Sequence, residues 1–168
     1  LQELGLEKLP KLIFISNDTT AAIKTGEFTK ENYGKLGIEI EVKNYPVAAL
    51  KEMRQKGEFD LFFGGWGPDY WDPLTFLDLW VTTGPFNEGK WSNTQYDEII
   101  RFAQTTFDTE ERMNRLLEGE RILIADEAGI VPVYYRKNAR LTKANVLDYV
   151  THPFGAENDW RFVKIATE

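Results

Sequence analysis

The residues best suited to chemistry lie between Phe59 and Pro73, where two tryptophans, a tyrosine and two aspartates follow a pair of glycines. Rigid aromatic side chains beside a fixed negative charge suit a small ligand that carries an amine or another cation. An equally simple interpretation places the aromatic residues in the core and makes Asp69 and Asp72 ordinary turn residues, because Gly, Pro and Asp are common in turns.

Two other kinds of chemistry are conceivable for the same carboxylates. Asp69 and Asp72 could be the paired acids of a glycoside hydrolase, with tryptophans stacking on the sugar. Together with Asp78 they could bind calcium, although their spacing is not that of an EF-hand loop. The sequence has one histidine and no cysteine, which excludes Cys/His zinc sites and thiol- or histidine-based triads. We therefore expect no catalytic residues, no metal and no cofactor.

Clustered tryptophans permit a third interpretation, in which this is a protein-interaction domain. The four residues concerned are Trp66, Trp71, Trp80 and Trp91. Tryptophan is common at the hot spots of protein interfaces. It is equally suited to a core, and we expect Trp80 and Trp91 to be core residues.

The elements that must position this stretch alternate between strands and helices. The hydrophobic patterns predict strands at 11–16, 38–42 and 59–63, and helices at 21–36 and 47–56. This alternation predicts a parallel sheet. The run 59–63 is almost entirely apolar, so we expect a strand that is buried on both faces. The loop that follows it would then lie at the carboxyl end of a strand, where ligands usually bind in open α/β sheets.

The later part of the chain is expected to be mainly helical. The predicted elements are a short helix at 74–80, a surface loop at 82–91, a helix at 94–104, a long helix from 109 to about 128 that Gly129 stops, a strand at 130–135, and short extended pieces at 140–141 and 146–150. In the first helix, Ile23, Phe28, Tyr33 and Leu36 are the expected apolar face, and Gly26 should weaken that helix by about 1 kcal/mol relative to alanine.

Composition restricts the class of protein further. A hydrophobic fraction of 42% and an aromatic fraction of 14% indicate a globular chain. A net charge of −7 argues against nucleic acid as a partner, because such binders usually present a basic patch. The first residues have the character of mid-protein sequence, so we expect the chain to be a fragment of something longer.

Several motifs in order resemble the oligopeptide- and dipeptide-binding proteins of ABC importers, the family 5 extracellular solute-binding proteins. The most specific is Phe59-Asp60-Leu61 … Gly65-Trp66-Gly67-Pro68-Asp69-Tyr70 … Asp72-Pro73 … Phe76-Leu77. The others are Leu36-Gly37-Ile38, Tyr96-Asp97, the helix 109–128, and Ile130-Val131-Pro132-Val133-Tyr134-Tyr135 followed by Asn138-Ala139-Arg140. Together they cover nearly the whole chain.

This resemblance implies an α/β fold, namely a periplasmic-binding-protein-like lobe with a mixed sheet flanked by helices. It implies that the lobe is part of a two-lobed protein that closes on an extended peptide. By the same analogy, residues 1–141 would form the second, C-terminal lobe and residues 142–168 would return to the first lobe. Without that first lobe, Trp160, Phe162 and Ile165 would be exposed or repacked.

The resemblance also implies which residues bind the ligand. Asp69 matches the aspartate that pairs with the free α-amino group of the peptide, and Trp66 would form a wall of the pocket. Gly65 and Gly67 would let the backbone come close to the ligand, and Tyr70 belongs to the same motif. Some relatives have an arginine three residues before the tryptophan, where this chain has Phe63, so the preferred peptide length does not carry over.

The implied partners are an extended peptide, the membrane subunits of an ABC transporter and the missing N-terminal lobe, with no nucleic acid. The implied location is the extracellular face of a membrane, through a lipid anchor, or the periplasm. The wider subfamily also binds nickel chelates, haem and oligosaccharides, so the resemblance leaves the identity of the solute open.

Overall fold

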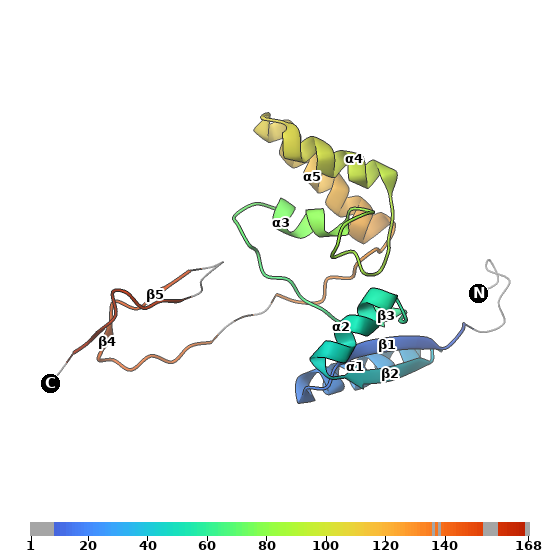
Figure 1. The fold of residues 1–168 in the computed structure, drawn as a ribbon, viewed down its shortest axis with the longest axis horizontal. Coiled ribbons are helices and arrows are strands. Elements are labelled where there is room, and N and C mark those ends of the chain that lie inside the picture. The colour runs from blue at the N-terminus through green and yellow to red at the C-terminus, as the bar shows by residue number, and fades with distance from the viewer. Residues whose placement is uncertain (1–8, 136, 138, 153–157, 167–168) are drawn as a thin grey trace. The chain divides into compact units, whose positions relative to one another are not determined.

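The computed structural model describes residues 9–135, 137, 139–152 and 158–166. The chain divides into two compact units (Figure 1). The first unit contains Leu1–Gly65 and Glu88–Lys90, and the second contains Trp66–Asn87 and Trp91–Glu168. Both parallel and antiparallel strand pairs occur, in separate sheets.

The first unit is built on a three-stranded parallel sheet. Its strands are β1 (Leu12–Asn17), β2 (Ile40–Tyr45) and β3 (Leu61–Phe62), in the order β2-β1-β3. β1 pairs with β2 over its whole length, from Leu12 opposite Ile40 to Asn17 opposite Tyr45. Two helices, α1 (Thr20–Lys35) and α2 (Val47–Lys56), connect the strands. The predicted strand and helix alternation and the parallel pairing are confirmed.

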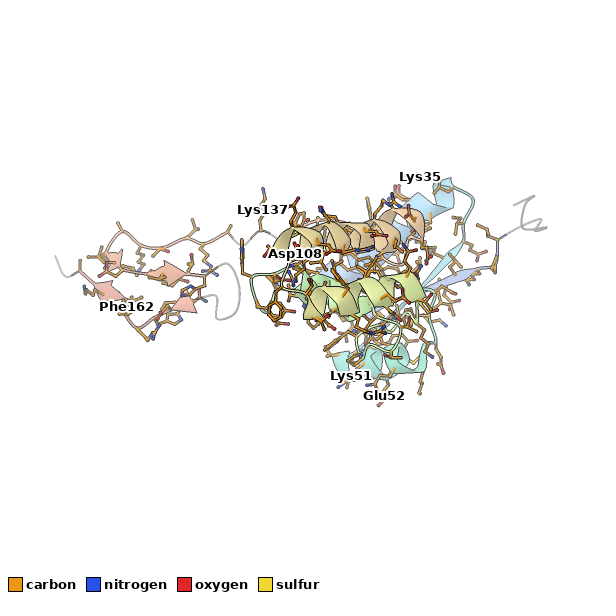
Figure 2. The ribbon with its side chains drawn as sticks, turned by 90° about the horizontal axis from the view of Figure 1, so that it is seen from above. Lys35, Lys51, Glu52, Asp108, Lys137 and Phe162 are labelled. Carbon is orange, nitrogen blue, oxygen red and sulfur yellow. The ribbon has the colours of Figure 1, made fainter. Side chains whose placement is uncertain are left out.

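Helix α2 has the predicted ends because the residues next to each end favour the start and the stop of a helix. Pro46 precedes its first turn, where a missing N–H costs nothing. Gly57 ends it with a left-handed backbone of φ 71°, a conformation that glycine adopts without strain. Leu50 is buried, whereas Lys51 and Glu52 are exposed and point away from the rest of the first unit (Figure 2).

The expectation of a buried strand at 59–63 is wrong. Only Leu61 and Phe62 pair as a strand, at the edge of the sheet, and both are half-buried. The rings of Phe59 and Phe62 meet edge to face, with their centroids 6.2 Å apart. The guanidinium carbon of Arg54 lies 4.2 Å from the centroid of the Phe62 ring. The aromatic side chain of Phe62 is therefore shielded by Phe59 and Arg54, without a layer of structure on both faces of the strand.

The expected apolar face of α1 is also wrong. Ile23, Phe28 and Leu36 are exposed, and the one buried residue of the helix is Gly26. A Cβ built at Gly26 would lie 2.6 Å from Cγ1 of Val42. The helix therefore packs on the sheet through a small residue that allows close approach, so Gly26 has a packing role that offsets its low helix propensity.

The second unit has a helical core. It contains α3 (Leu74–Leu77), the 3-10 helix η2 (Asp78–Trp80), α4 (Thr94–Thr105), α5 (Thr109–Arg121) and the π-helical segment η3 (Ile122–Asp126). The buried cluster consists of Leu74, Leu77, Tyr96, Ile100, Ala103, Leu116 and Leu123. Trp80 and Trp91 are half-buried against this cluster, which confirms them as core residues.

The long helix ends two residues earlier than predicted. Helical structure stops at Asp126, and Ala128 has the left-handed backbone, with a φ of 50°. Gly129 is instead needed for space, because a Cβ there would lie 3.0 Å from side-chain atoms of both Leu123 and Trp91. The apolar residues of this helix divide between core and surface. Leu116, Ile122 and Leu123 are buried, whereas Met113, Leu117 and Ala125 are exposed.

The predicted strand at 130–135 is wrong, since these residues form no strand in the described part of the chain. Val131, Val133, Tyr134 and Tyr135 are exposed. The extended piece at 140–141 forms no strand either, and the motif residue Asn138 lies outside the described residues. A strand needs a partner to satisfy its backbone groups, and the apolar pattern alone does not supply one.

Two antiparallel ribbons follow. β4 (Val146–Leu147) pairs with β7 (Lys164–Ile165), and β5 (Val150–Thr151) pairs with β6 (Asn158–Asp159). Trp160, Phe162 and Ile165 are exposed in this region, as the resemblance leads one to expect; Phe162 is labelled in Figure 2.

None of the described helices has the length and apolar character needed to cross a membrane.

Candidate functional site

A cavity of about 290 Å³ lies within the second unit. Its polar lining consists of Asp69, Tyr70, Thr75 and Asp78, and its apolar lining consists of Trp66, Leu79, Pro85 and Phe86. A larger hollow of about 460 Å³ lies on α1 in the first unit, but Glu27, Phe28, Lys30 and Glu31 of a single helix line it. Side chains from several elements converge on the cavity of the second unit, whereas one helix alone lines the hollow on α1. We therefore take the cavity of the second unit as the candidate site.

A hydrogen bond to α3 holds the acidic loop in place. The backbone N–H of Asp69 donates to Oγ1 of Thr75 at 2.9 Å, and Thr75 is buried in the short helix that follows. The N–H of Leu74 donates to Oδ1 of Asp72 at 2.9 Å. The loop and the start of α3 are therefore fixed by each other, while the carboxylate of Asp69 belongs to an exposed residue of the cavity wall.

Asp72 serves the fold and does not line the cavity. Both terminal guanidinium nitrogens of Arg112 donate to it, one to each carboxylate oxygen, at 2.8 Å. Nε of Arg112 also donates to the carbonyl of Ala103 at 2.7 Å, which ties the loop to α4 and α5. The hydrogen bonds from Arg112 hold the pKa of Asp72 below its usual value. Because both of its oxygens are engaged, the geometry does not favour Asp72 as one of two paired acids of a glycoside hydrolase.

Asp78 is the second carboxylate of the cavity. Burial raises its pKa above the usual value, and the nearby charge of Asp69 raises it further, against the lowering effect of a hydrogen bond from Tyr70. Burial, followed by the charge of Asp78, raises the pKa of Tyr70. Among the described residues that line the cavity there is no lysine, arginine or histidine. The cavity is therefore electronegative and suits a cation.

Aromatic side chains form another part of the lining. The rings of Trp66 and Phe86 meet edge to face, with centroids 4.9 Å apart. The loop that carries Phe86 is held by the buried Asn87, whose Nδ2 donates to the carbonyl of Trp91 at 2.6 Å and to that of Val81 at 3.2 Å. An aromatic surface beside two carboxylates can receive the positive charge of a ligand and the apolar atoms next to it.

The structure brings together three of the five residues predicted to bind the ligand. Trp66, Asp69 and Tyr70 line the same cavity. Gly65 and Gly67 are not among its lining residues, and a Cβ built at either would meet nothing within 4 Å. No contact within the protein therefore requires glycine there, and their approach to a ligand stays a prediction.

The sequence does not mark the rest of the lining as ligand-binding, namely Thr75, Leu79, Pro85 and Phe86. Asp78 was predicted only as a possible calcium ligand. In the described part of the chain, no three acidic, histidine or cysteine residues come close enough to hold a metal ion. The turn from α3 into η2 brings Asp78 back to the loop, and no local pattern in the sequence marks that turn.

Comparisons with known proteins find relatives that match most of the chain. The sequence profile of "Bacterial extracellular solute-binding proteins, family 5 Middle" matches residues 1–88. A dipeptide-binding protein of Lactococcus lactis is 29% identical over 163 residues, which are 95% of this chain and 30% of the relative. The dipeptide-binding protein DppE of Bacillus subtilis is 28% identical over 92% of this chain and 28% of its own length.

Solved structures show the same similarity over almost the entire chain. The substrate-binding domain of an oligopeptide ABC transporter from Bacillus anthracis superposes with a TM-score of 0.85 at 28% identity, covering 99% of this chain and 33% of that one. OppA of Listeria monocytogenes, solved with a bound peptide, gives 0.82 at 32% identity, covering 99% and 32%. The chain thus spans about a third of the length of these relatives, and it belongs to the family 5 bacterial extracellular solute-binding proteins.

Proposed function

We propose that this chain forms one lobe of a peptide-binding protein of an ABC importer, and that its acidic cavity receives the free α-amino group of the peptide. The observation that carries the proposal is the convergence of Trp66, Asp69 and Tyr70 on one cavity without a cationic side chain among its described lining residues. Two relatives, a dipeptide-binding protein of Lactococcus lactis and the peptide-bound OppA of Listeria monocytogenes, support the same class of ligand.

Asp69 is the proposed partner of the ammonium group. An ammonium that leaves water for a closed site needs a counter-charge, because leaving it unpaired costs several kcal/mol. The loop that carries Asp69 is fixed through Thr75, so little further ordering is needed when the ligand arrives. The rest of an extended peptide would be held through main-chain hydrogen bonds, which depend little on its side chains.

The domain organisation follows from the same proposal. Residues 1–141 would belong to the second lobe, and residues 142–168 would pass to the first lobe of the intact protein. The exposure of Trp160, Phe162 and Ile165 supports a covering partner in that region. The remaining partners would be the membrane subunits of the transporter. The site of action would be outside the cytoplasmic membrane, either in the periplasm or at the cell surface through a lipid anchor.

Replacement of Asp69 tests this proposal in the two-lobed protein that contains the chain. Asp69→Ala should weaken binding of a mixed-sequence pentapeptide by about 2–5 kcal/mol, as when one partner of a buried charge pair is removed. Calorimetric titration measures the change. Asp126→Asn is the control, because Asp126 lies outside the cavity and pairs with Arg121 on the surface at 3.2 Å. Equal affinity of Asp69→Ala and wild type would refute the assignment of the ammonium site.

A further inference from the structure

Resting on the proposed function, we infer that Asp78 is a specificity-determining residue of the amine cavity, which holds the ligand's ammonium group between the carboxylates of Asp69 and Asp78. The two residues come from different elements, the loop before α3 and the 3-10 helix after it, and they line the same cavity of about 290 Å³. A primary ammonium has three N–H donors, so it can donate to both carboxylates at once.

The surroundings of Asp78 leave it suited to this contact. Asp78 and Tyr70 both line the cavity, and hydrogen bonding from Tyr70 counteracts part of the rise in the pKa of Asp78. Asp78 is half-buried, and no ion pair of the kind that occupies Asp72 is found for it among the described residues. A second negative charge next to Asp69 is unfavourable in the empty site, and a bound cation removes that repulsion.

Binding is therefore coupled to the protonation of Asp78. Burial and the charge of Asp69 raise the pKa of Asp78 in the free protein, so acidification neutralises it earlier than an ordinary aspartate. An ammonium favours the ionised carboxylate, so affinity is highest above the pKa of Asp78, and falls as the pH falls through it. In that range, binding of the ligand releases a proton.

Few other groups can produce this dependence. The titratable groups that interact with Asp78 are Asp69 and Tyr70 in the loop and Tyr96 on α4. Burial raises the pKa of Tyr96, as it does that of Tyr70, so neither tyrosine ionises in acid. Among the described residues this leaves the carboxylates of Asp69 and Asp78, and separate variants distinguish them.

The experiment is a titration of the two-lobed protein with a C-terminally amidated peptide that lacks acidic and histidine side chains. Such a ligand has no carboxyl or imidazole group that titrates in acid, so a loss of affinity on acidification comes from the protein. Asp78→Asn keeps the shape of the side chain and removes its charge. Asp126→Asn makes the same chemical change outside the cavity.

We expect Asp78→Asn to weaken binding about tenfold at neutral pH, the loss of one charge-assisted contact. The acid-side loss of affinity should begin at lower pH than in wild type. Tyr70→Phe provides a second test, because it removes the hydrogen bond that lowers the pKa of Asp78. It should move the acid-side loss to higher pH, which a purely structural role of Asp78 would not do.

The outcomes separate this inference from the proposed function. If Asp69→Asn abolishes binding while Asp78→Asn matches Asp126→Asn in affinity and pH profile, the ammonium site stands and the role of Asp78 is refuted. If wild type does not bind the free-amine peptide, or binds it no better than its N-acetylated form, both are refuted. Circular dichroism of each variant verifies that the fold is retained.

Discussion

Asp72 and Asp78 lie at opposite ends of α3 and have opposite electrostatic environments. Arg112 donates hydrogen bonds to both carboxylate oxygens of Asp72 and holds the pKa of Asp72 below its usual value. Asp78 has Asp69 and Tyr70 as neighbours, and burial raises its pKa. Asp72 therefore stabilises the fold, whereas the carboxylate of Asp78 lines the cavity.

The first prediction at this scale concerns the stability of the second unit. Asp72→Asn should lower its free energy of unfolding by about 1–2 kcal/mol, since charged hydrogen bonds are lost at a partly exposed site. Urea unfolding at neutral pH measures this change. Asp126→Asn, which disturbs only a surface ion pair with Arg121, should lie close to wild type.

The same contact sets a dependence on pH. The folded-state pKa of Asp72 is lowered, so its contribution is fully present above its unfolded pKa and is lost as the pH falls through the lowered folded pKa. The unfolding free energies of wild type and Asp72→Asn should therefore converge in acid. A constant difference between them down to acid pH would contradict the role of the Asp72–Arg112 pair.

Helix α1 shows at the scale of elements how a sequence pattern can mislead. Its large apolar residues Ile23 and Phe28 are exposed, as is Leu36 directly after its last residue, whereas the sheet contact is made at Gly26. Propensity and hydrophobicity are local properties, and they do not reveal which side of a helix approaches a sheet most closely. The 2.6 Å between a Cβ built at Gly26 and Cγ1 of Val42 shows that the Gly26 side of α1 lies closest to the sheet.

Two glycines of α1 provide a matched test. Gly26→Ala should destabilise the first unit by about 1–3 kcal/mol, because the new Cβ would lie 2.6 Å from Val42 and the packing has to shift. Gly34→Ala meets nothing within 4 Å, so it should stabilise the helix by about 0.5–1 kcal/mol. Thermal unfolding of the two variants compares them, and destabilisation of similar size in both would contradict the close contact at Gly26.

Elements were predictable where local sequence carries the whole signal. Pro46 and Gly57 mark the ends of α2, and the helical spacing of Tyr96, Ile99, Ile100 and Ala103 matches the buried face of α4. The lack of strand structure at residues 130–135 was not predictable, because pairing depends on a distant partner that an apolar pattern does not specify. The site was predicted in part for the same reason. Asp69 and Trp66 stand in a motif, whereas Asp78 and Phe86 reach the cavity only through the turns that follow it.

At the scale of the whole molecule, the chain covers about a third of the length of its relatives. Its exposed apolar residues include Tyr135, Leu141, Trp160 and Phe162. Surfaces of this kind are unusual on a free-standing domain. In the proposed two-lobed protein they would lie against other parts of the polypeptide, and the acidic cavity would be closed over the amino end of the peptide.

Calorimetric titration of the two-lobed protein with one pentapeptide, free and N-acetylated, tests this account most directly. Acetylation removes the positive charge of the amino group and leaves the rest of the peptide unchanged. We predict tight binding of the free form and a loss of about 2–5 kcal/mol on acetylation, because the carboxylates of the cavity would lose their counter-charge. Equal affinity for the two forms would contradict the ammonium site.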